Sequence, residues 1–92
     1  MKLTIRPGSG SSLETDRGSH RFTYAVQGMP DGQEARLINH GTERKPRWHF
    51  ARRLKIDSEM MENLISYKTA DEALAALQKE VDEDEAAEYY ES

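Results

Sequence analysis

Apolar residues recur at helical spacing over residues 70–81 and then stop. The stripe consists of Ala70, Ala73, Leu74, Leu77 and Val81, and a stripe of this width covers one face of a sheet. Continued at 100° per residue, the same face next meets Asp84 and Glu88, and carboxylates cannot stay docked on an apolar core. We therefore expect residues 82–92 to project as a solvated helical extension or to lie disordered, unless a basic surface receives them.

The start of this helix is marked by the sequence Thr69-Ala70-Asp71-Glu72. In such a capping box the first hydroxyl accepts a hydrogen bond from the amide of the fourth residue, whose carboxylate accepts one from the first amide. We expect Thr69 and Glu72 to be paired in this way. It is the most specific local signal in the chain.

Three earlier segments alternate apolar and polar residues with the period of two that buries one sheet face. They are residues 2–6, 21–27 and 35–40. The second and third are joined by Met29-Pro30-Asp31-Gly32, where proline fixes φ for the second turn position and glycine tolerates a positive φ, so we predict a hairpin. Residues 8–19 are rich in glycine and serine and predict a mobile loop.

Residues 48–56 predict a fourth strand. One parity of this strand carries Trp48, Phe50, Leu54 and Ile56. Arg52 falls on the same apolar parity, so either its guanidinium reaches past the sheet edge or a bulge at Arg52 or Arg53 resets the register. We favour the bulge.

Between this strand and the last helix, Asp57 or Ser58 can cap a short helix that runs to about Ile65. The alternative is a short strand over residues 63–68. The fold predicted overall is α+β: a small antiparallel sheet of three or four strands, with one face covered by a C-terminal helix and a short helix before it. We expect a single domain over residues 1–81 and an acidic extension over residues 82–92.

Charge is divided unevenly along the chain. Residues 1–56 hold eleven Lys and Arg against five Asp and Glu, a net charge of +6, whereas residues 57–92 hold two against twelve, a net charge of -10. Such asymmetry indicates an electrostatic partner for one of the halves. Tyrosines within the acidic run would act as aromatic anchors of the kind favoured at interfaces. The predicted partner-binding residues are Asp82, Glu83, Asp84, Glu85, Glu88, Tyr89 and Tyr90.

A polyanionic surface of this kind can imitate the spacing of phosphates and occupy the basic groove of a protein that handles nucleic acid. Long-range attraction speeds such an encounter. The leading hypothesis is a non-enzymatic regulator or inhibitor of a larger protein with a basic nucleic-acid-binding surface. Inhibitors carried by phages and other mobile elements, such as anti-CRISPR proteins, are commonly this small, acidic and free of cysteine, a comparison of type that rests on no matched residues.

Other hypotheses remain open. Basic residues interleaved with Trp48 and Phe50 favour single-stranded nucleic acid, which pairs its phosphates with cations and stacks its bases on aromatic rings, although the parity of those rings is typical of a core. The residues of this alternative are Arg44, Lys45, Arg47, Arg52, Arg53 and Lys55. The acidic run is also typical of a solubilising end, and it can fold back on the basic segment through individually weak pairs. A third hypothesis is a small structural subunit, monomeric or homodimeric, that pairs through a sheet edge.

Several chemistries are disfavoured. The chain has no cysteine, which excludes disulfides, thiolate nucleophiles and cysteine-bound zinc. Its three histidines lack the helical spacing of a metal site; His20 and His40 fall at strand ends that can approach one another, and His49 lies on the opposite parity from Trp48. We therefore expect a protein with no enzymatic activity, no cofactor and no bound metal. With no apolar run that fits a signal peptide or a membrane span, we expect a soluble cytoplasmic protein.

Overall fold

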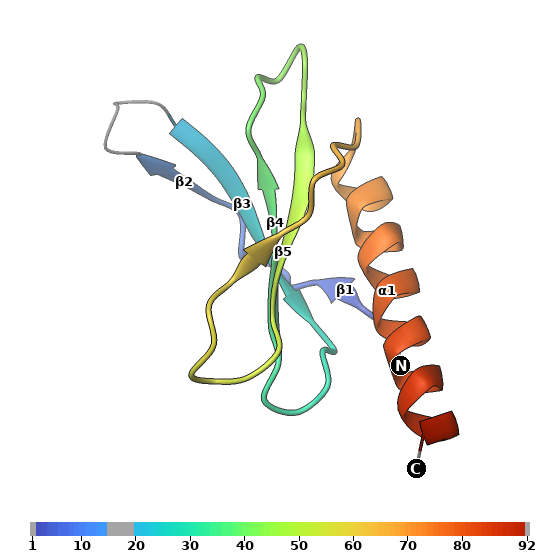
Figure 1. Ribbon diagram of the computed structural model, residues 1–92. Coiled ribbons are helices and arrows are strands. Elements are labelled where there is room, and N and C mark those ends of the chain that lie inside the picture. The colour runs from blue at the N-terminus through green and yellow to red at the C-terminus, as the bar shows by residue number, and fades with distance from the viewer. Residues whose placement is uncertain (1, 15–19, 92) are drawn as a thin grey trace.

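In the computed structural model, the described residues form six strands and one helix in two layers (Figure 1). Residues 2–14 and 20–91 are described, with side chains described over residues 2–12 and 22–86. The elements are β1 (Thr4–Ile5), β2 (Ser11–Glu14), β3 (His20–Gln27), β4 (Glu34–Asn39), β5 (Trp48–Arg53), β6 (Met61–Glu62) and α1 (Ala70–Glu91). The sheet is antiparallel with the order β1-β3-β4-β5-β6, and β2 pairs with the same strand as β1 does, β3. The predicted α+β class, with a C-terminal helix on an antiparallel sheet, is confirmed.

The sheet has six strands where the sequence predicted three or four. The additional strand β2 lies in the segment expected to be a loop, and residues 15–19 of that segment are outside the described part of the chain. Ser11 pairs with Thr23 of β3, and their hydroxyl oxygens are 3.3 Å apart. An edge strand forms here without an apolar face because the backbone supplies the ladder hydrogen bonds.

The hairpin predicted between the second and third segments is confirmed as the connection from β3 to β4. The amide of Gln33 donates to the carbonyl of Pro30 across 3.0 Å, and Gly32 has a φ of 79°. Pro30 is therefore the first residue of the turn and not the second, so the turn begins one residue later than the pattern suggested. The positive φ falls on the glycine, which has no Cβ to clash.

Strand β5 is regular and ends earlier than predicted. Its register with β4 is continuous from Asn39↔Trp48 to Glu34↔Arg53, so the predicted bulge is wrong and Arg52 stays on the face of Trp48 and Phe50. Since Glu34 is the first residue of β4, this strand offers no backbone partner beyond Arg53. Leu54 and Ile56, which the sequence placed in the core, are consequently exposed.

The short helix predicted before α1 is absent. Residues 54–60 form a turn in which the hydroxyl of Ser58 accepts from the amide of Lys55 and donates to its carbonyl, so this serine closes a turn instead of capping a helix. Strand β6 then pairs with β5. The alternative strand over residues 63–68 is reduced to one bridge, in which Tyr67 and Trp48 exchange two backbone hydrogen bonds of 2.8 Å.

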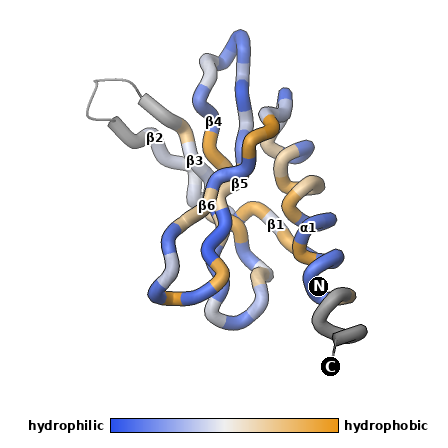
Figure 2. The backbone as a smooth tube through the Cα atoms, viewed as in Figure 1, coloured by the Kyte–Doolittle hydropathy of each residue, from blue (hydrophilic) through white to orange (hydrophobic). Residues whose placement is uncertain are grey.

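Helix α1 covers one sheet face and packs against β4 and β5. The predicted stripe holds, because Ala73, Leu77 and Val81 are fully buried. The other buried members of the core are Leu3, which directly precedes β1, and the strand residues Ala35, Leu37, Trp48 and Phe50. Figure 2 shows the contrast between these interior segments and the hydrophilic tip of the β4–β5 loop.

The start of α1 confirms half of the capping box. The hydroxyl of Thr69 accepts from the amide of Glu72 at 3.1 Å, as predicted. The carboxylate of Glu72 accepts from the amide of Lys68, one residue before the expected donor. Both bonds satisfy amide groups near the helix start that have no partner within the helix.

Removing the cap is expected to be measurable. Thr69→Ala should lower the free energy of unfolding by about 1 kcal/mol, since an amide in the first turn loses its acceptor. Urea unfolding followed by the fluorescence of Trp48, the only tryptophan, measures the change. Thr69→Ser keeps the hydroxyl and should stay within a few tenths of a kcal/mol of the parent protein; equal losses in the two variants would show that the hydroxyl is not the source.

Candidate functional site

The C-terminal part of α1 carries the acidic residues that the sequence singled out. The helix has 22 residues, and Val81 is the last fully buried one among those up to residue 86, where the described side chains end. Residues 82–85, here called the acidic helix end, follow immediately, and all four are exposed. The backbone of Glu88, Tyr89 and Tyr90 belongs to the same helix, but their side chains lie outside the described part of the structure.

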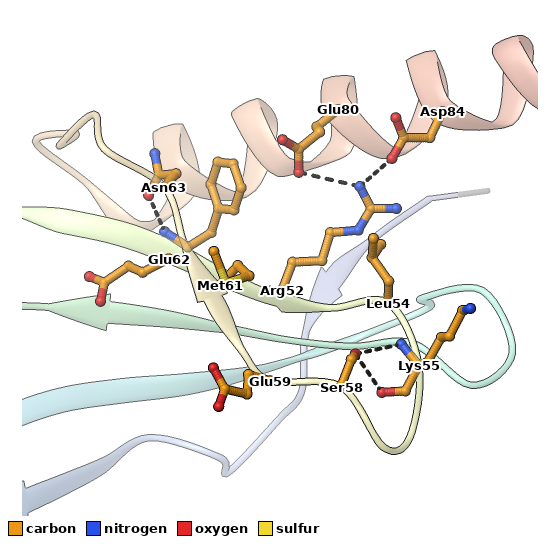
Figure 3. Close-up of a pocket in the computed structure, with 11 residues that line it drawn as sticks. Arg52, Leu54, Lys55, Ser58, Glu59, Met61, Glu62, Asn63, Glu80 and Asp84 are labelled. Atoms are coloured by element: carbon orange, nitrogen blue, oxygen red, sulfur yellow. Dashed lines mark hydrogen bonds and ion pairs between the residues drawn. The ribbon is translucent and has the colours of Figure 1, made fainter.

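One basic residue of the sheet receives this end of the helix. Nη1 of Arg52 donates to Asp84 Oδ2 at 2.6 Å and to Glu80 Oε2 at 3.3 Å (Figure 3). Its Nε and Nη2 donate to Oε1 of Gln33 at 3.3 and 2.8 Å, so the guanidinium joins the β3–β4 hairpin to the helix. The side chain of Arg52 is only 8% exposed, whereas those of Glu80 and Asp84 are 48% and 54% exposed. Two carboxylates therefore share one cation, and a net negative charge remains.

The other acidic side chains are not neutralised by the sheet. Asp82 accepts a hydrogen bond from the amide group of Gln78 at 3.0 Å, which leaves its charge intact. Glu83 and Glu85 form no ion pair with any residue whose side chain is described. Lys79 is the only basic residue in α1. The acidic helix end is thus a dense, exposed and largely uncompensated anionic surface.

The basic segment is divided by β5. Arg44, Lys45 and Arg47 are exposed in the loop before this strand, and Figure 1 shows that loop at the opposite end of the molecule from the C-terminus of α1. Six strand residues, which span about 20 Å, separate them from Lys55. Arg52 and Arg53 both form ion pairs. Arg52 pairs with Asp84, and Nη2 of Arg53 lies 2.6 Å from Oε2 of Glu34.

The aromatic residues of that segment do not join its cations on the surface. Trp48 and Phe50 are buried in the core, and Trp48 stacks on Tyr24 with ring centroids 5.5 Å apart. Their rings are therefore not free to stack on bases. The six cations proposed as one nucleic-acid site are placed at two separate ends of β5. Among the described residues only Arg52 and Arg53 of the six form ion pairs, whereas the loop group and Lys55 form none.

A pocket of about 710 Å³ lies beside the acidic helix end, between α1 and the chain that follows β5. Figure 3 shows Arg52 extending between Leu54 and Met61 towards Glu80 and Asp84. Phe50 also lines the pocket. Sequence reasoning missed this feature because it assigned Leu54 to the core and placed Met61 within a short helix that does not form.

Two of the three histidines, His40 and His49, lie on the sheet face opposite α1. Nε2 of His40 donates to the carboxylate of Glu62, and the rings of His40 and His49 meet edge to face with centroids 5.2 Å apart. Nδ1 of His49 donates to the carbonyl of Asn63 at 3.1 Å. These contacts tie the ends of β4, β5 and β6 together. The side chain of His20 is outside the described part, so its expected approach to His40 is not described.

Two further observations bear on function. Over the described ranges, no three His, Asp or Glu side chains are grouped so as to hold a metal ion, and no helix combines the length and apolar character needed to cross a bilayer. Comparison with protein-family models, with curated proteins and with solved structures finds no match to the chain. Function is therefore inferred from the surface itself.

Proposed function

We propose that this protein is a non-enzymatic regulator or inhibitor that binds a larger cytoplasmic protein, using the acidic helix end to occupy a basic surface that otherwise receives nucleic acid. The observation that carries the proposal is the density of uncompensated charge. Four successive carboxylates follow Val81, the last buried residue among those of α1 whose side chains are described, and three of them, Asp82, Glu83 and Glu85, have no cationic partner among the described residues. At a rise of about 1.5 Å per residue, they approach the one charge per about 1.7 Å of axis in duplex DNA.

The alternatives find less support. The basic residues of segment 44–55 are separated, and its aromatic rings are buried. Edge pairing is disfavoured because the described sheet edges are short, with β1 and β6 two residues long and β2 four. Short edge strands are one means by which proteins avoid pairing with other sheets.

The test neutralises the exposed acidic residues and spares the one that stabilises the fold. The triple variant Asp82→Asn/Glu83→Gln/Glu85→Gln keeps Asp84, because Arg52 depends on it. Proteins captured from an extract of the native host by the wild-type chain are identified, and their affinity for both chains is measured by titration. At low salt we expect the variant to bind at least about tenfold more weakly, and the difference to shrink as salt screens the attraction.

A matched control removes three charges elsewhere. Asp31→Asn/Glu43→Gln/Asp57→Asn changes three exposed acidic residues outside α1, and its affinity should stay close to that of the wild type. The captured partner should also release a bound oligonucleotide when the wild-type chain is added. Equal affinity of the triple variant and the wild type would reject the acidic helix end as the interface. Retardation of an oligonucleotide by this protein alone, with a steep salt dependence, would favour the basic loop instead.

A further inference from the structure

The pocket beside α1 has two walls of different chemistry. Glu80 and Asp84 of the helix form one wall, and Leu54 and Met61 contribute to the other, with Arg52 between them (Figure 3). Its volume of about 710 Å³ is within the range of about 300–1,000 Å³ that is usual for binding pockets. The pocket is therefore large enough to receive several side chains.

The apolar wall is unusually exposed for side chains of its kind. Leu54 is 56% exposed and Met61 is 70% exposed. Covering them would remove apolar area from water, which favours association. Methionine also adapts its shape to different partners because its side chain is unbranched. These two residues form a surface suited to the apolar side chains of a partner.

The charge of the pocket indicates the chemistry of that partner. Four of the lining residues are acidic, namely Glu59, Glu62, Glu80 and Asp84, against Arg52 and Lys55. The guanidinium of Arg52 is already occupied by its hydrogen bonds to the helix and the hairpin. A phosphate would meet excess negative charge here, whereas a lysine or arginine beside an apolar side chain would find complementary groups on both walls.

We propose that this pocket docks an amphipathic segment of a partner protein, with a large apolar side chain on Leu54 and Met61 and a lysine or arginine facing Glu80 and Asp84. The inference rests on the proposed function: the acidic helix end attracts the basic partner, and the pocket selects the segment that binds. Recognition of an amphipathic segment by an apolar groove is a common mode of peptide binding. Attraction and selection are then carried by adjacent but different residues.

A synthetic helical peptide of leucine and lysine, with the leucines on one face, serves as the probe. Calorimetric titration measures its affinity for the full chain, and amide chemical shifts locate the contact. We expect Leu54→Gln/Met61→Gln to weaken binding at least about tenfold, since both apolar anchors are lost. Leu64→Gln is the matched control, because Leu64 is 98% exposed and lies outside the pocket, and it should bind like the wild type.

The outcomes separate this inference from the proposed function. If Leu54→Gln/Met61→Gln binds the probe as tightly as wild type while Asp82→Asn/Glu83→Gln/Glu85→Gln loses affinity, the pocket is excluded and the acidic helix end remains. The reverse pattern supports the pocket and rejects that end as the source of attraction. Binding of a leucine–glutamate peptide with the same leucine positions as tight as the lysine peptide, or a Kd above about 1 mM for the latter, overturns the proposed charge selection.

Discussion

Replacing Leu77 by alanine is expected to lower the free energy of unfolding by about 3–5 kcal/mol, as is typical when a fully buried leucine is truncated. Leu77 has no exposed surface and packs where α1 meets the sheet, in a cluster with Leu37 and Phe50. A chain of 92 residues has an expected total stability of only about 5–14 kcal/mol. The truncation therefore removes a large share of it. Thermal unfolding should shift down by at least about 12 °C.

The control for this experiment is Leu64→Ala, which makes the same chemical change at a residue that is 98% exposed. Its stability should remain within about 0.5 kcal/mol of the wild type. Urea unfolding of both variants, followed by Trp48 fluorescence, compares them directly. If the two substitutions lowered the free energy of unfolding by similar amounts, residues 63–65 would have to be packed in solution. The assignment of α1 to the core would then be wrong.

The parts of the fold that could be predicted from the sequence are those set by neighbouring residues. The cap at Thr69, the hairpin at Gly32 and the buried stripe ending at Val81 each depend on a few positions within one turn or one element. Local geometry and side-chain chemistry fix these features before any tertiary contact is made. The acidic helix end belongs to the same class, because composition alone identifies it.

The remaining features depend on which backbone partners are available. The length of β5 follows from the length of β4, whose first residue Glu34 pairs with Arg53. The hydrophobic pattern of residues 48–56 contains no information about that limit, so Leu54 was placed in the core. The pocket could not be predicted from the sequence for the same reason, because it forms where β5 ends and the following chain turns back towards β6.

Two apparent anomalies in the sequence explain each other. Arg52 is a charge on the apolar parity of a strand, and Asp84 is a charge on the apolar stripe of a helix. Considered separately, the first suggested a bulge and the second suggested a helix end released from the sheet. In the structure, Nη1 of Arg52 donates a hydrogen bond of 2.6 Å to Oδ2 of Asp84. Opposite charges on the facing sides of two packed elements therefore indicate a pair, and this signal was present in the sequence.

Arg52→Ala is expected to lower the free energy of unfolding by about 2–3 kcal/mol. The substitution removes a buried guanidinium that bonds Gln33, Glu80 and Asp84, and hydrogen bonds to charged groups contribute about 1.5–3 kcal/mol each. The estimate is below their sum because both carboxylates are about half exposed and regain water when the cation is lost. Part of the cost is the packing of the arginine stem between Leu54 and Met61.

Arg52→Met separates packing from charge. Methionine restores much of the apolar volume but none of the hydrogen bonds, so about 1 kcal/mol of the loss should be recovered relative to alanine. In both variants Glu80 and Asp84 repel one another at a spacing of four residues, and added salt should therefore raise their stability relative to the wild type. Hydrogen exchange should report faster opening of the amides of residues 82–86 than in the wild type. Unchanged exchange there, together with a full loss of stability, would mean that Arg52 stabilises the sheet and hairpin without holding the helix end.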